Sequence, residues 1–299
     1  MSTTNAECQQ QSTIETPDGR GLHLRRWGEG VGDIAIVVVH GLGEHSGWYD
    51  EFGETMSCDT LSCETLSRET ISNDNITTYA YDQHGHGKSP GVRGHASSLD
   101  RFVDDVQVVC DYVAEDQPGA EIVLLGHSMG GHITLKYLLR SNSHPVHRAI
   151  VTNPMILPKD PPTKAQSFAA WLTAKIIPRV RVSADIEPTQ LTQDTEMLRQ
   201  LAHDPLMHEK LSIGIGGELM SSGHEILEQA SSLGTELLFL TGSDDEICDP
   251  ETSRTFCERS GKNCSTKTFD GLRHSLLIEA RRDEVFETIK TWLSQNTGR

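Results

Sequence analysis

The fold is decided by residues 122–131, which have the sequence Ile122-Val123-Leu124-Leu125-Gly126-His127-Ser128-Met129-Gly130-Gly131. An apolar run typical of a buried strand leads into Gly-x-Ser-x-Gly, and the residues from Ile133 to Leu139 then follow a helical pattern. A serine on such a sharp strand-to-helix turn has its hydroxyl exposed at the edge of the sheet, and glycines let the backbone turn tightly around it. The first N–H groups of the helix point to the same place, where negative charge forms when a carbonyl is attacked. Ser128 is therefore a candidate nucleophile.

Outside this stretch, strand-like apolar runs alternate with helical patterns. Residues 13–27 predict a β-hairpin with its turn at Pro17-Asp18-Gly19. Continuous apolar runs such as 34–39 are typical of strands covered on both faces, as in a parallel sheet. The alternation predicts an α/β fold with a mostly parallel, doubly wound sheet. The predicted strands are 34–39, 77–81, 122–125, 149–152, 237–240 and 266–269, and the predicted helices are 100–114, 129–140 and 283–293.

Two stretches interrupt the alternation. Residues 155–225 lie between two predicted sheet strands, are too long for a simple crossover, and carry helical patterns at 168–177, 195–202 and 211–227. They predict a helical cap above the carboxyl ends of the strands, where such sheets bind ligands, and leave residues 1–154 and 226–299 as the core. The stretch 53–75 contains a short repeat of acid, Thr, aliphatic and Ser. It predicts a helix-plus-loop insertion, to which we assign no function.

A serine nucleophile on this fold needs an acid and then a histidine later in the chain. Asp245 follows the predicted strand 237–240, and His274 follows the predicted strand 266–269, so both lie at the same edge of the sheet as Ser128. Neutral His274 would accept the Ser128 proton during attack and then donate it to the leaving alcohol, while Asp245 would hold the imidazole in the required tautomer. From the residues alone, Asp244 or Asp249 can take the place of Asp245.

The negative charge that forms during attack needs two backbone donors. Met129, directly after the nucleophile, supplies one N–H group, and Leu42, in the loop after the predicted strand 34–39, supplies the other. No metal or organic cofactor is expected, because the protein itself supplies attack, proton transfer and charge stabilisation. The alternative from a different class is a non-catalytic ligand-binding protein on the same scaffold. Such proteins often lose a member of the triad, whereas this chain has a candidate for each.

The composition excludes some other functions. The 299-residue chain has a net charge of −17, which argues against nucleic-acid binding through a basic field. No apolar run approaches the ~18 residues of a membrane-spanning helix, and Met1–Ser12 lacks the apolar stretch of a signal peptide. The seven cysteines form no Cys-x-x-Cys pair, so we expect free thiols in a reducing cytoplasm. His84 and His86 have no further ligands nearby in the sequence and are expected to be loop histidines rather than a metal site.

Longer motifs resemble one family in particular. Residues 40–49 (His-Gly-Leu-Gly-Glu-His-Ser-Gly-Trp-Tyr), residues 81–95 and the cap motif Asp204-Pro205-Leu206 are similar to those of monoacylglycerol lipases and related lysophospholipases. The resemblance covers about residues 20 to 294. It implies an α/β-hydrolase with a helical lid that hydrolyses the ester of a single-chain glycerolipid, and it favours Asp245 as the acid. It also implies substrate-pocket positions at Glu44, Trp48 and Cys248, although a small buried residue is an equally good interpretation of Cys248.

The chain departs from the family pattern at three positions near the expected site. Trp48 replaces an arginine, His84 replaces a frequent arginine, and Leu277 replaces a polar residue that some members carry. These changes leave the core chemistry intact and put the alcohol preference in doubt. A carboxylesterase, thioesterase or lysophospholipase with another head group therefore remains an alternative. Dehalogenases and epoxide hydrolases, which resemble this fold, place Asp rather than Ser at the turn.

The cap carries an apolar stripe within a locally basic segment. Five positive residues and one acid lie between Lys159 and Arg181, on an otherwise acidic protein. This combination predicts peripheral contact with membranes or admission of lipid monomers. The alternative is that the stripe packs on the core. The stripe consists of Phe168, Trp171, Leu172, Ile176 and Ile177.

Overall fold

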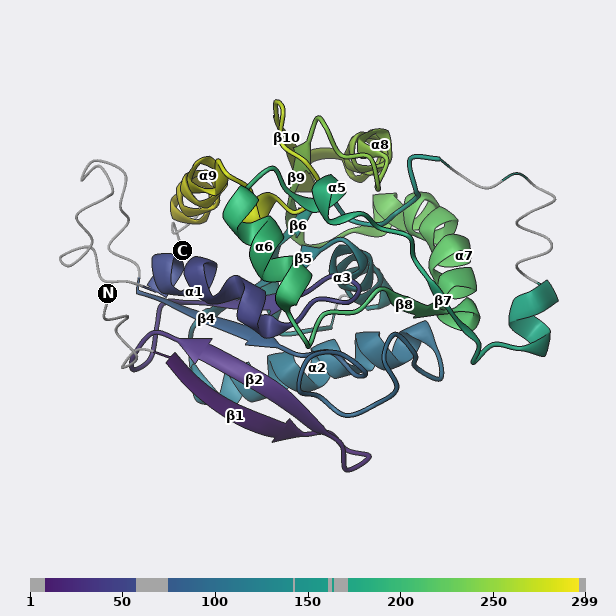
Figure 1. Ribbon diagram of the computed structural model, residues 1–299. Helices are drawn as coiled ribbons and strands as arrows, with labels where there is room; N and C mark the ends of the chain where they lie inside the picture. Colours follow the sequence, from purple (N-terminus) through teal and green to yellow (C-terminus); the bar gives the residue numbers. More distant parts are fainter. Residues whose placement is uncertain (1–8, 58–74, 142, 161–162, 164–171, 296–299) are drawn as a thin grey trace.

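A computed structural model describes residues 9–57, 75–141, 143–160, 163 and 172–295. Its main sheet has eight strands in the order β1-β2-β4-β3-β5-β6-β9-β10 (Figure 1). The first two strands pair antiparallel, and β2 pairs antiparallel with β4, while all later neighbours are parallel. The predicted α/β fold with a mostly parallel sheet is confirmed. The strands are β1 Gln9–Glu15, β2 Gly21–Trp27, β3 Ile34–Val39, β4 Ile76–Tyr81, β5 Glu121–His127, β6 Val146–Thr152, β9 Glu236–Gly242 and β10 Cys264–Phe269.

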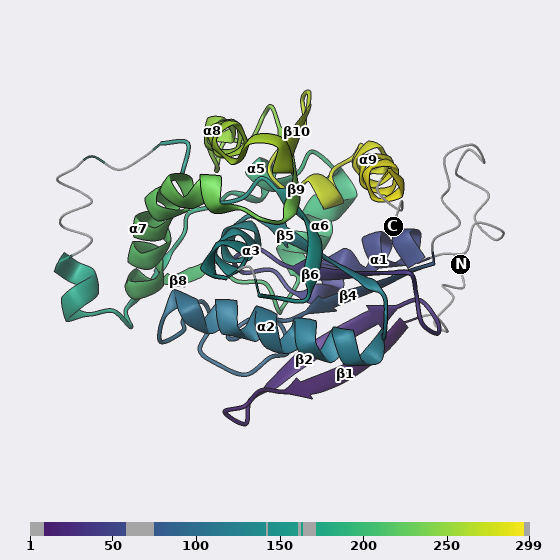
Figure 2. The same cartoon turned by 180° about the vertical axis from the view of Figure 1, so that it is seen from behind.

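Helices cover both faces of this sheet because successive residues of its central strands point to opposite sides. Val37 and Val39 of β3 belong to one buried cluster, with the helices α2 Leu99–Asp116, α3 Met129–Arg140 and α8 Pro250–Ser260. Ile36 and Val38 belong to the other, with α1 Asp50–Ser57 and α9 Arg282–Ser294. Figure 2 shows α2 crossing the first of these faces, beside α3. The continuous apolar run of β3 therefore reflects a strand that is buried on both sides.

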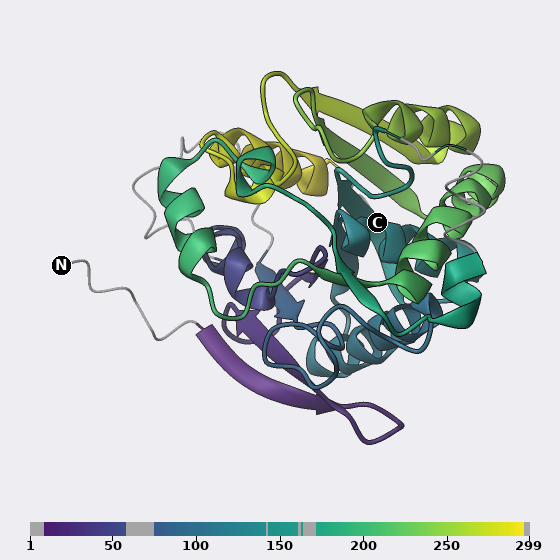
Figure 3. The same ribbon diagram turned by 45° about the vertical axis from the view of Figure 1, so that its right-hand side comes forward.

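The predicted cap, residues 155–225, falls in the segment between β6 and β9, and we keep the name cap for these residues. Its described elements are β7 Arg181–Ser183, α5 Pro188–Leu191, α6 Thr195–His203, β8 Lys210–Ser212 and α7 Ile213–Gln229. Figure 3 shows these green segments running across the molecule in front of the strands. The antiparallel pair β7–β8 was not predicted. Helix α7 extends past the proposed cap boundary at residue 225 and packs on the core beside α3.

Two of the sequence expectations fall largely on residues outside the described ranges. Most of the insertion 53–75 does so, since only α1 and the residues from 75 onward are described there. The predicted helix 168–177 is described only from residue 172. None of the helices in the described ranges is long and apolar enough to cross a membrane.

The expectation that all cysteines are free is wrong. Cys257 and Cys264 form a disulfide, with their Cα atoms 5.1 Å apart. Cys257 lies in the last turns of α8, and a short 3₁₀ turn brings the chain back to Cys264 at the start of β10. The pairing follows from this tight return of the chain, which a Cys-x-x-Cys spacing does not reveal. Cys110 and Cys248 are free and buried.

Candidate active site

Ser128 lies on the sharp turn between β5 and α3, with the unusual backbone angles φ 52° and ψ −117°. Its neighbours leave no room for side chains at the glycines of the motif. A Cβ atom on Gly126 would lie 2.4 Å from Thr134 Oγ1, and one on Gly130 would lie 1.9 Å from the carbonyl oxygen of Val39. The positive φ of a non-glycine residue is a strained conformation that persists because the surrounding packing fixes it. The packed turn thereby places the Ser128 side chain at the carboxyl edge of the sheet.

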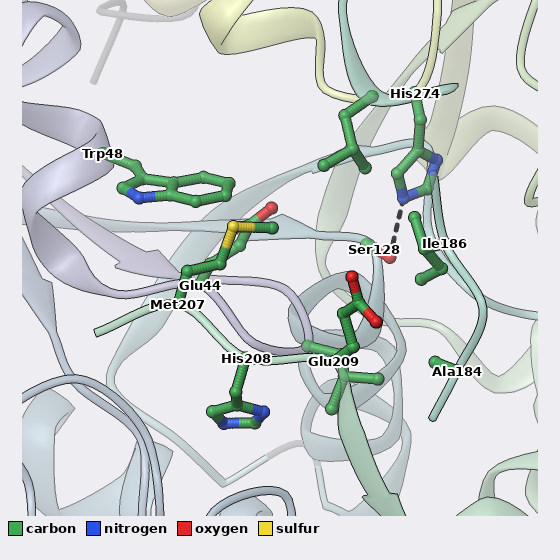
Figure 4. A pocket seen from close by; sticks show the side chains of 11 residues that line it. Glu44, Trp48, Ser128, Ala184, Ile186, Met207, His208, Glu209 and His274 are labelled. Carbon is green, nitrogen blue, oxygen red and sulfur yellow. Dashed lines mark hydrogen bonds between the residues drawn. The ribbon is translucent and has the colours of Figure 1, made fainter. Parts of the chain in front are cut away.

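The three predicted triad residues are brought together. His274 Nε2 lies 2.9 Å from Ser128 Oγ, and His274 Nδ1 lies 2.9 Å from Asp245 Oδ2 (Figure 4 shows the first of these contacts). Asp245 and His274 are almost completely buried. Burial alone would raise the pKa of Asp245, but His274 and the N–H groups of Ile247 and Cys248 hold it below its ordinary value. An ionised Asp245 then fixes His274 with Nδ1 protonated, which leaves Nε2 free to accept the Ser128 proton.

The structure shows which of the three candidate acids contacts His274. Asp244 is exposed and accepts a hydrogen bond only from the neighbouring Ser243 hydroxyl among the described side chains. Asp249 accepts from the N–H of Glu251 and caps α8. Asp245 is the acid that contacts His274.

Asn153 is a further site residue, and the sequence analysis missed it. It follows β6, with φ 40°, and its side chain joins two loops of the triad. Its Oδ1 accepts from the N–H of Gly242 at 3.0 Å, and its Nδ2 donates to the carbonyl oxygen of His274 at 2.6 Å. The signal that points to it is its place directly after a parallel strand, at the same edge as the triad residues.

The loop after β3 carries Leu42 and is held by Glu44. The Glu44 carboxylate accepts from the N–H of Gly41 at 2.9 Å and from the Tyr49 hydroxyl at 2.7 Å, and it lies 3.3 Å from His127 Nε2. Burial alone would raise the pKa of Glu44, but His127 and the Gly41 N–H lower it to about 2. Burial likewise opposes protonation of His127, yet Glu44 raises its pKa above the ordinary value. A buried ion pair thus joins this loop to the residue before Ser128.

The predicted oxyanion donors lie in the required elements. Met129 is the first residue of α3, and Leu42 lines the cavity beside Ser128. No hydrogen bond within the described residues uses the N–H group of Leu42 or of Met129. Both groups therefore remain available for a ligand oxygen.

The cavity beside Ser128 is small and lies between core and cap. Its volume is about 30 Å³, whereas pockets that hold drug-sized ligands have roughly 300–1,000 Å³. Glu44 and Trp48 line it, whereas Cys248 is not among its described lining residues. Cys248 is buried, with its sulfur 3.6 Å from that of Met155. The lining residues are Leu42, Glu44, Trp48, Ser128, Ala184, Ile186, Leu191, Met207, His208, Glu209 and His274 (Figure 4).

Within the described residues, the one cluster with the spacing of a metal site is Asp245, Cys248 and His274. Both ring nitrogens of His274 already contact the triad partners. His84 and His86 belong to no such cluster in the described part of the chain, and the buried His86 packs against the ring of His208, 4.7 Å away. The geometry of the cluster is that of a triad acid and base.

The protein has a strained serine at a strand-to-helix turn of a mostly parallel sheet. This serine contacts a histidine, which in turn contacts a buried aspartate. Together these features define an α/β-hydrolase of the serine hydrolase class. A family model agrees with this classification. Residues 32–281 match the Hydrolase_4 family, described as serine aminopeptidase, S33, and the chain belongs to this family.

Curated relatives and solved structures are similar over most of the chain. The human monoglyceride lipase is 31% identical, over 94% of this chain and 89% of the relative. An uncharacterized abhydrolase domain-containing protein of Dictyostelium discoideum is 30% identical over 95% of this chain, which spans 29% of that longer protein. The structure of a soluble variant of the Saccharomyces cerevisiae monoglyceride lipase superposes with a TM-score of 0.82 at 21% identity, covering 100% of this chain and 99% of the other. The chain is therefore a serine hydrolase of the monoglyceride lipase and esterase group.

Proposed function

We propose that this protein hydrolyses esters of a single acyl chain, monoacylglycerols or similar lipids, through an acyl-enzyme on Ser128. The observation that carries the proposal is the continuous hydrogen-bond chain from Ser128 through His274 to Asp245 at a strained turn. The names of the monoglyceride lipase relatives support the lipid ester as substrate. General carboxylesterase, thioesterase and lysophospholipase activities are the alternatives within enzymes, and a ligand-binding protein without activity is the remote one.

The reaction follows from the placement of these groups. His274 Nε2 takes the proton of Ser128 as its oxygen attacks the ester carbonyl, and the N–H groups of Leu42 and Met129 stabilise the resulting oxyanion. His274 then gives the proton to the leaving alcohol, and the acyl group stays on Ser128. Water, deprotonated by the same histidine, attacks the acyl-enzyme, and the histidine returns this proton to the Ser128 oxygen as the fatty acid leaves.

The small cavity means that the cap must move before a long acyl chain can enter. Apolar side chains of the cap, among them Ile186, Leu191 and Met207, line the space above Ser128. They pack with Trp48 and Ile278 of the core in a small apolar cluster that contains few fully buried residues. Opening this cluster exposes apolar surface that an acyl chain can cover in turn.

We also propose that the cap contacts a lipid surface. Leu172, Ile176 and Ile177 are exposed, so these three do not pack on the core, contrary to the alternative considered above. Val180 and Val182 of the same segment are also exposed, and we call these five apolar residues the cap patch. Lys175, Arg179 and Arg181 lie in the same segment. Exposed apolar side chains interspersed with positive charges are typical of a segment that lies in a membrane interface.

The activity is tested with 1-monoacylglycerol, lysophosphatidylcholine and short p-nitrophenyl esters, with Ser128→Ala as the matched variant. We expect wild-type protein to release acid from at least one ester and Ser128→Ala to lose this activity. A fluorophosphonate probe should label the wild type and leave the variant unlabelled, whatever the natural substrate. Equal inactivity of both proteins on all esters, with no labelling, would support the ligand-binding alternative.

A further inference from the structure

The loop that carries His274 is bonded to the cap as well as to the core. On the core side, Asn153 Nδ2 donates to the carbonyl oxygen of His274 at 2.6 Å. On the cap side, the N–H group of His274 donates to the carbonyl oxygen of Gln190 at 3.3 Å. The N–H group of Ser275 donates to the carbonyl oxygen of Leu191 at 2.8 Å, and both acceptors belong to α5. The backbone of the general base is therefore held between the end of a core strand and a helix of the cap.

The side chain of Glu279 joins the same loop to the cap. Glu279 is completely buried. Its Oε1 accepts from the N–H group of Arg273, the residue directly before His274, at 2.9 Å. Its Oε2 accepts from the N–H group of Gln193 at 3.0 Å and lies 3.1 Å from the Thr192 hydroxyl, both in the cap. One carboxylate thus bridges the loop of the general base and the segment that follows α5.

The two oxygens of Glu279 have separate partners, and this separation requires an acid. Oε2 also accepts from the N–H group of Ala280 at 3.0 Å, so its described partners are all donors, as is the partner of Oε1. A carboxylate accepts hydrogen bonds at both oxygens, and such bonds are stronger than those of a neutral acceptor. An amide of the same shape accepts at one end only and donates at the other. A glutamine in this place would therefore lose the bond on one side of the bridge.

We propose that Glu279 is a positioning residue: by joining the cap to Arg273, it keeps the ring of His274 in contact with both of its triad partners. The two ring contacts are each 2.9 Å long, so a small displacement of the loop lengthens at least one of them. Glu279 is not among the described residues that line the cavity beside Ser128, so it acts on the base and not on the substrate. This inference rests on the proposed ester hydrolysis and is independent of which ester is the natural substrate.

The direct test is Glu279→Gln, assayed with a p-nitrophenyl ester. The amide oxygen can stay on the side of Oε2, where three donors meet, and the amide NH₂ group then faces the N–H group of Arg273. This contact between two donors should displace the loop of His274. We expect kcat to fall by about 10- to 100-fold, because small displacements of a catalytic group are costly. KM should stay within about 2-fold of the wild type, since the cavity itself is unchanged.

The matched control is Glu121→Gln, which removes a carboxylate at the opposite end of β5 from Ser128. Glu121 pairs with the buried Arg148, so this variant should lose thermal stability and keep the wild-type kcat. Turnover is divided by the concentration of sites that a fluorophosphonate probe labels at completion, so unfolded protein does not count. A wild-type kcat per labelled site in Glu279→Gln would mean that Glu279 only stabilises the fold, and the inference is then overturned.

The side chain of Arg273 provides a second variant in case Glu279→Gln does not fold. Its Nη1 donates to the carbonyl oxygens of Thr189 and Thr192 at 2.5 and 3.3 Å, which is a further link between the loop and the cap. Arg273 is only half-buried, so water can solvate these carbonyl groups in Arg273→Met. This variant should lower kcat per labelled site by about 3- to 10-fold at unchanged KM.

The outcomes separate this inference from the proposed function. If Glu279→Gln does not fold, a wild-type kcat in Arg273→Met overturns the inference. If the wild-type protein neither hydrolyses the p-nitrophenyl ester nor reacts with the fluorophosphonate probe, the proposed function fails first. An active wild type with unchanged kcat in the folded variants contradicts only the role of Glu279.

Discussion

The carboxyl edge of the sheet and the cap hold their side chains in opposite ways. At the edge, Asp245 and His274 are 1% and 2% exposed and make several hydrogen bonds to backbone and side-chain groups. In the cap, Ile176 is 70% exposed, and a small apolar cluster joins the cap to Trp48 and Ile278. The reacting groups are therefore preorganised, whereas the far end of the cap presents apolar side chains to solvent.

The largest effect on turnover is expected from replacing the acid of the triad, Asp245. Asp245→Asn leaves the shape of the site almost unchanged but permits the wrong tautomer of His274, so turnover should fall about 10⁴-fold. Asp244→Asn, one residue away on an exposed side chain, is the matched control and should keep wild-type kcat. Steady-state kinetics on a p-nitrophenyl ester measures both. A large loss in Asp244→Asn with little loss in Asp245→Asn would contradict the assignment of the acid.

The second prediction concerns the buried pair of Glu44 and His127, which ties the Leu42 loop to the nucleophile turn. Glu44→Gln leaves a buried imidazole without its counter-charge, and should lower the free energy of unfolding by about 3–5 kcal/mol. Glu209→Gln, an exposed carboxylate of the cap, should change it by less than about 0.5 kcal/mol. Chemical denaturation of the three proteins provides the measurement.

The same pair should give the stability a defined pH dependence. The pKa of Glu44 is about 2, below its ordinary value of 4.5, so its contribution is present above pH 4.5 and is lost as the pH falls toward 2. The pKa of His127 is raised above 6.5, so its contribution is present below pH 6.5 and is lost as the pH rises through the raised value. The stability difference between wild type and Glu44→Gln should be largest between pH 4.5 and 6.5. A difference that is constant from pH 3 to 9 would speak against the ion pair.

The site residues that could be predicted are defined by local sequence patterns, whereas the one that was missed is defined by contacts that are distant in sequence. Ser128, Asp245 and His274 each follow a strand with a recognisable apolar run, so their order and their common edge can be predicted from local patterns. Asn153, by contrast, acquires its role from Gly242 and His274, which lie 89 and 121 residues further along the chain. Its place directly after β6 marks Asn153 as a candidate, but its hydrogen-bond partners cannot be predicted from local patterns.

Dependence on the path of the chain also explains the other features of the structure that were not predicted. The Cys257–Cys264 disulfide depends on how the chain turns back from α8 to β10. The short β7–β8 pair depends on two cap segments that are separated by α5 and α6. Glu44 was predicted as a pocket residue from a motif, but its pairing with His127 requires the loop after β3 to lie against the end of β5. The sheet, with its long apolar strands, was predictable, whereas contacts between its connecting segments were not.

A smaller effect is expected where the cap contacts the loop that carries Leu42. Gly43 has φ 76°, and a Cβ atom there would lie 1.8 Å from the carbonyl oxygen of His208 in the cap. Gly43→Ala should push the cap away from the Leu42 loop and lower kcat/KM by about 10- to 100-fold, because small displacements of an oxyanion donor are costly. Gly19→Ala is the control, since Gly19 has φ 79° but no atom within 4 Å. It should lose some stability and no kcat/KM, and equal kinetic losses in both variants would mean that backbone strain alone is responsible.

The smallest effect on the chemistry is expected at the exposed end of the cap. Ile176→Ser removes an apolar side chain that is 70% exposed, so turnover of a dissolved p-nitrophenyl ester should stay within about 2-fold of the wild type. Binding to anionic lipid vesicles, measured by sedimentation, should weaken by about 10-fold or more, because an isoleucine that enters a lipid interface contributes about 1.5 kcal/mol or more. Val31→Ser, at an apolar side chain 54% exposed on a loop of the core, is the control and should bind vesicles as the wild type does. If Ile176→Ser and Val31→Ser both sediment like the wild type, the cap patch does not carry the protein to a membrane, and its exposed apolar residues need another explanation.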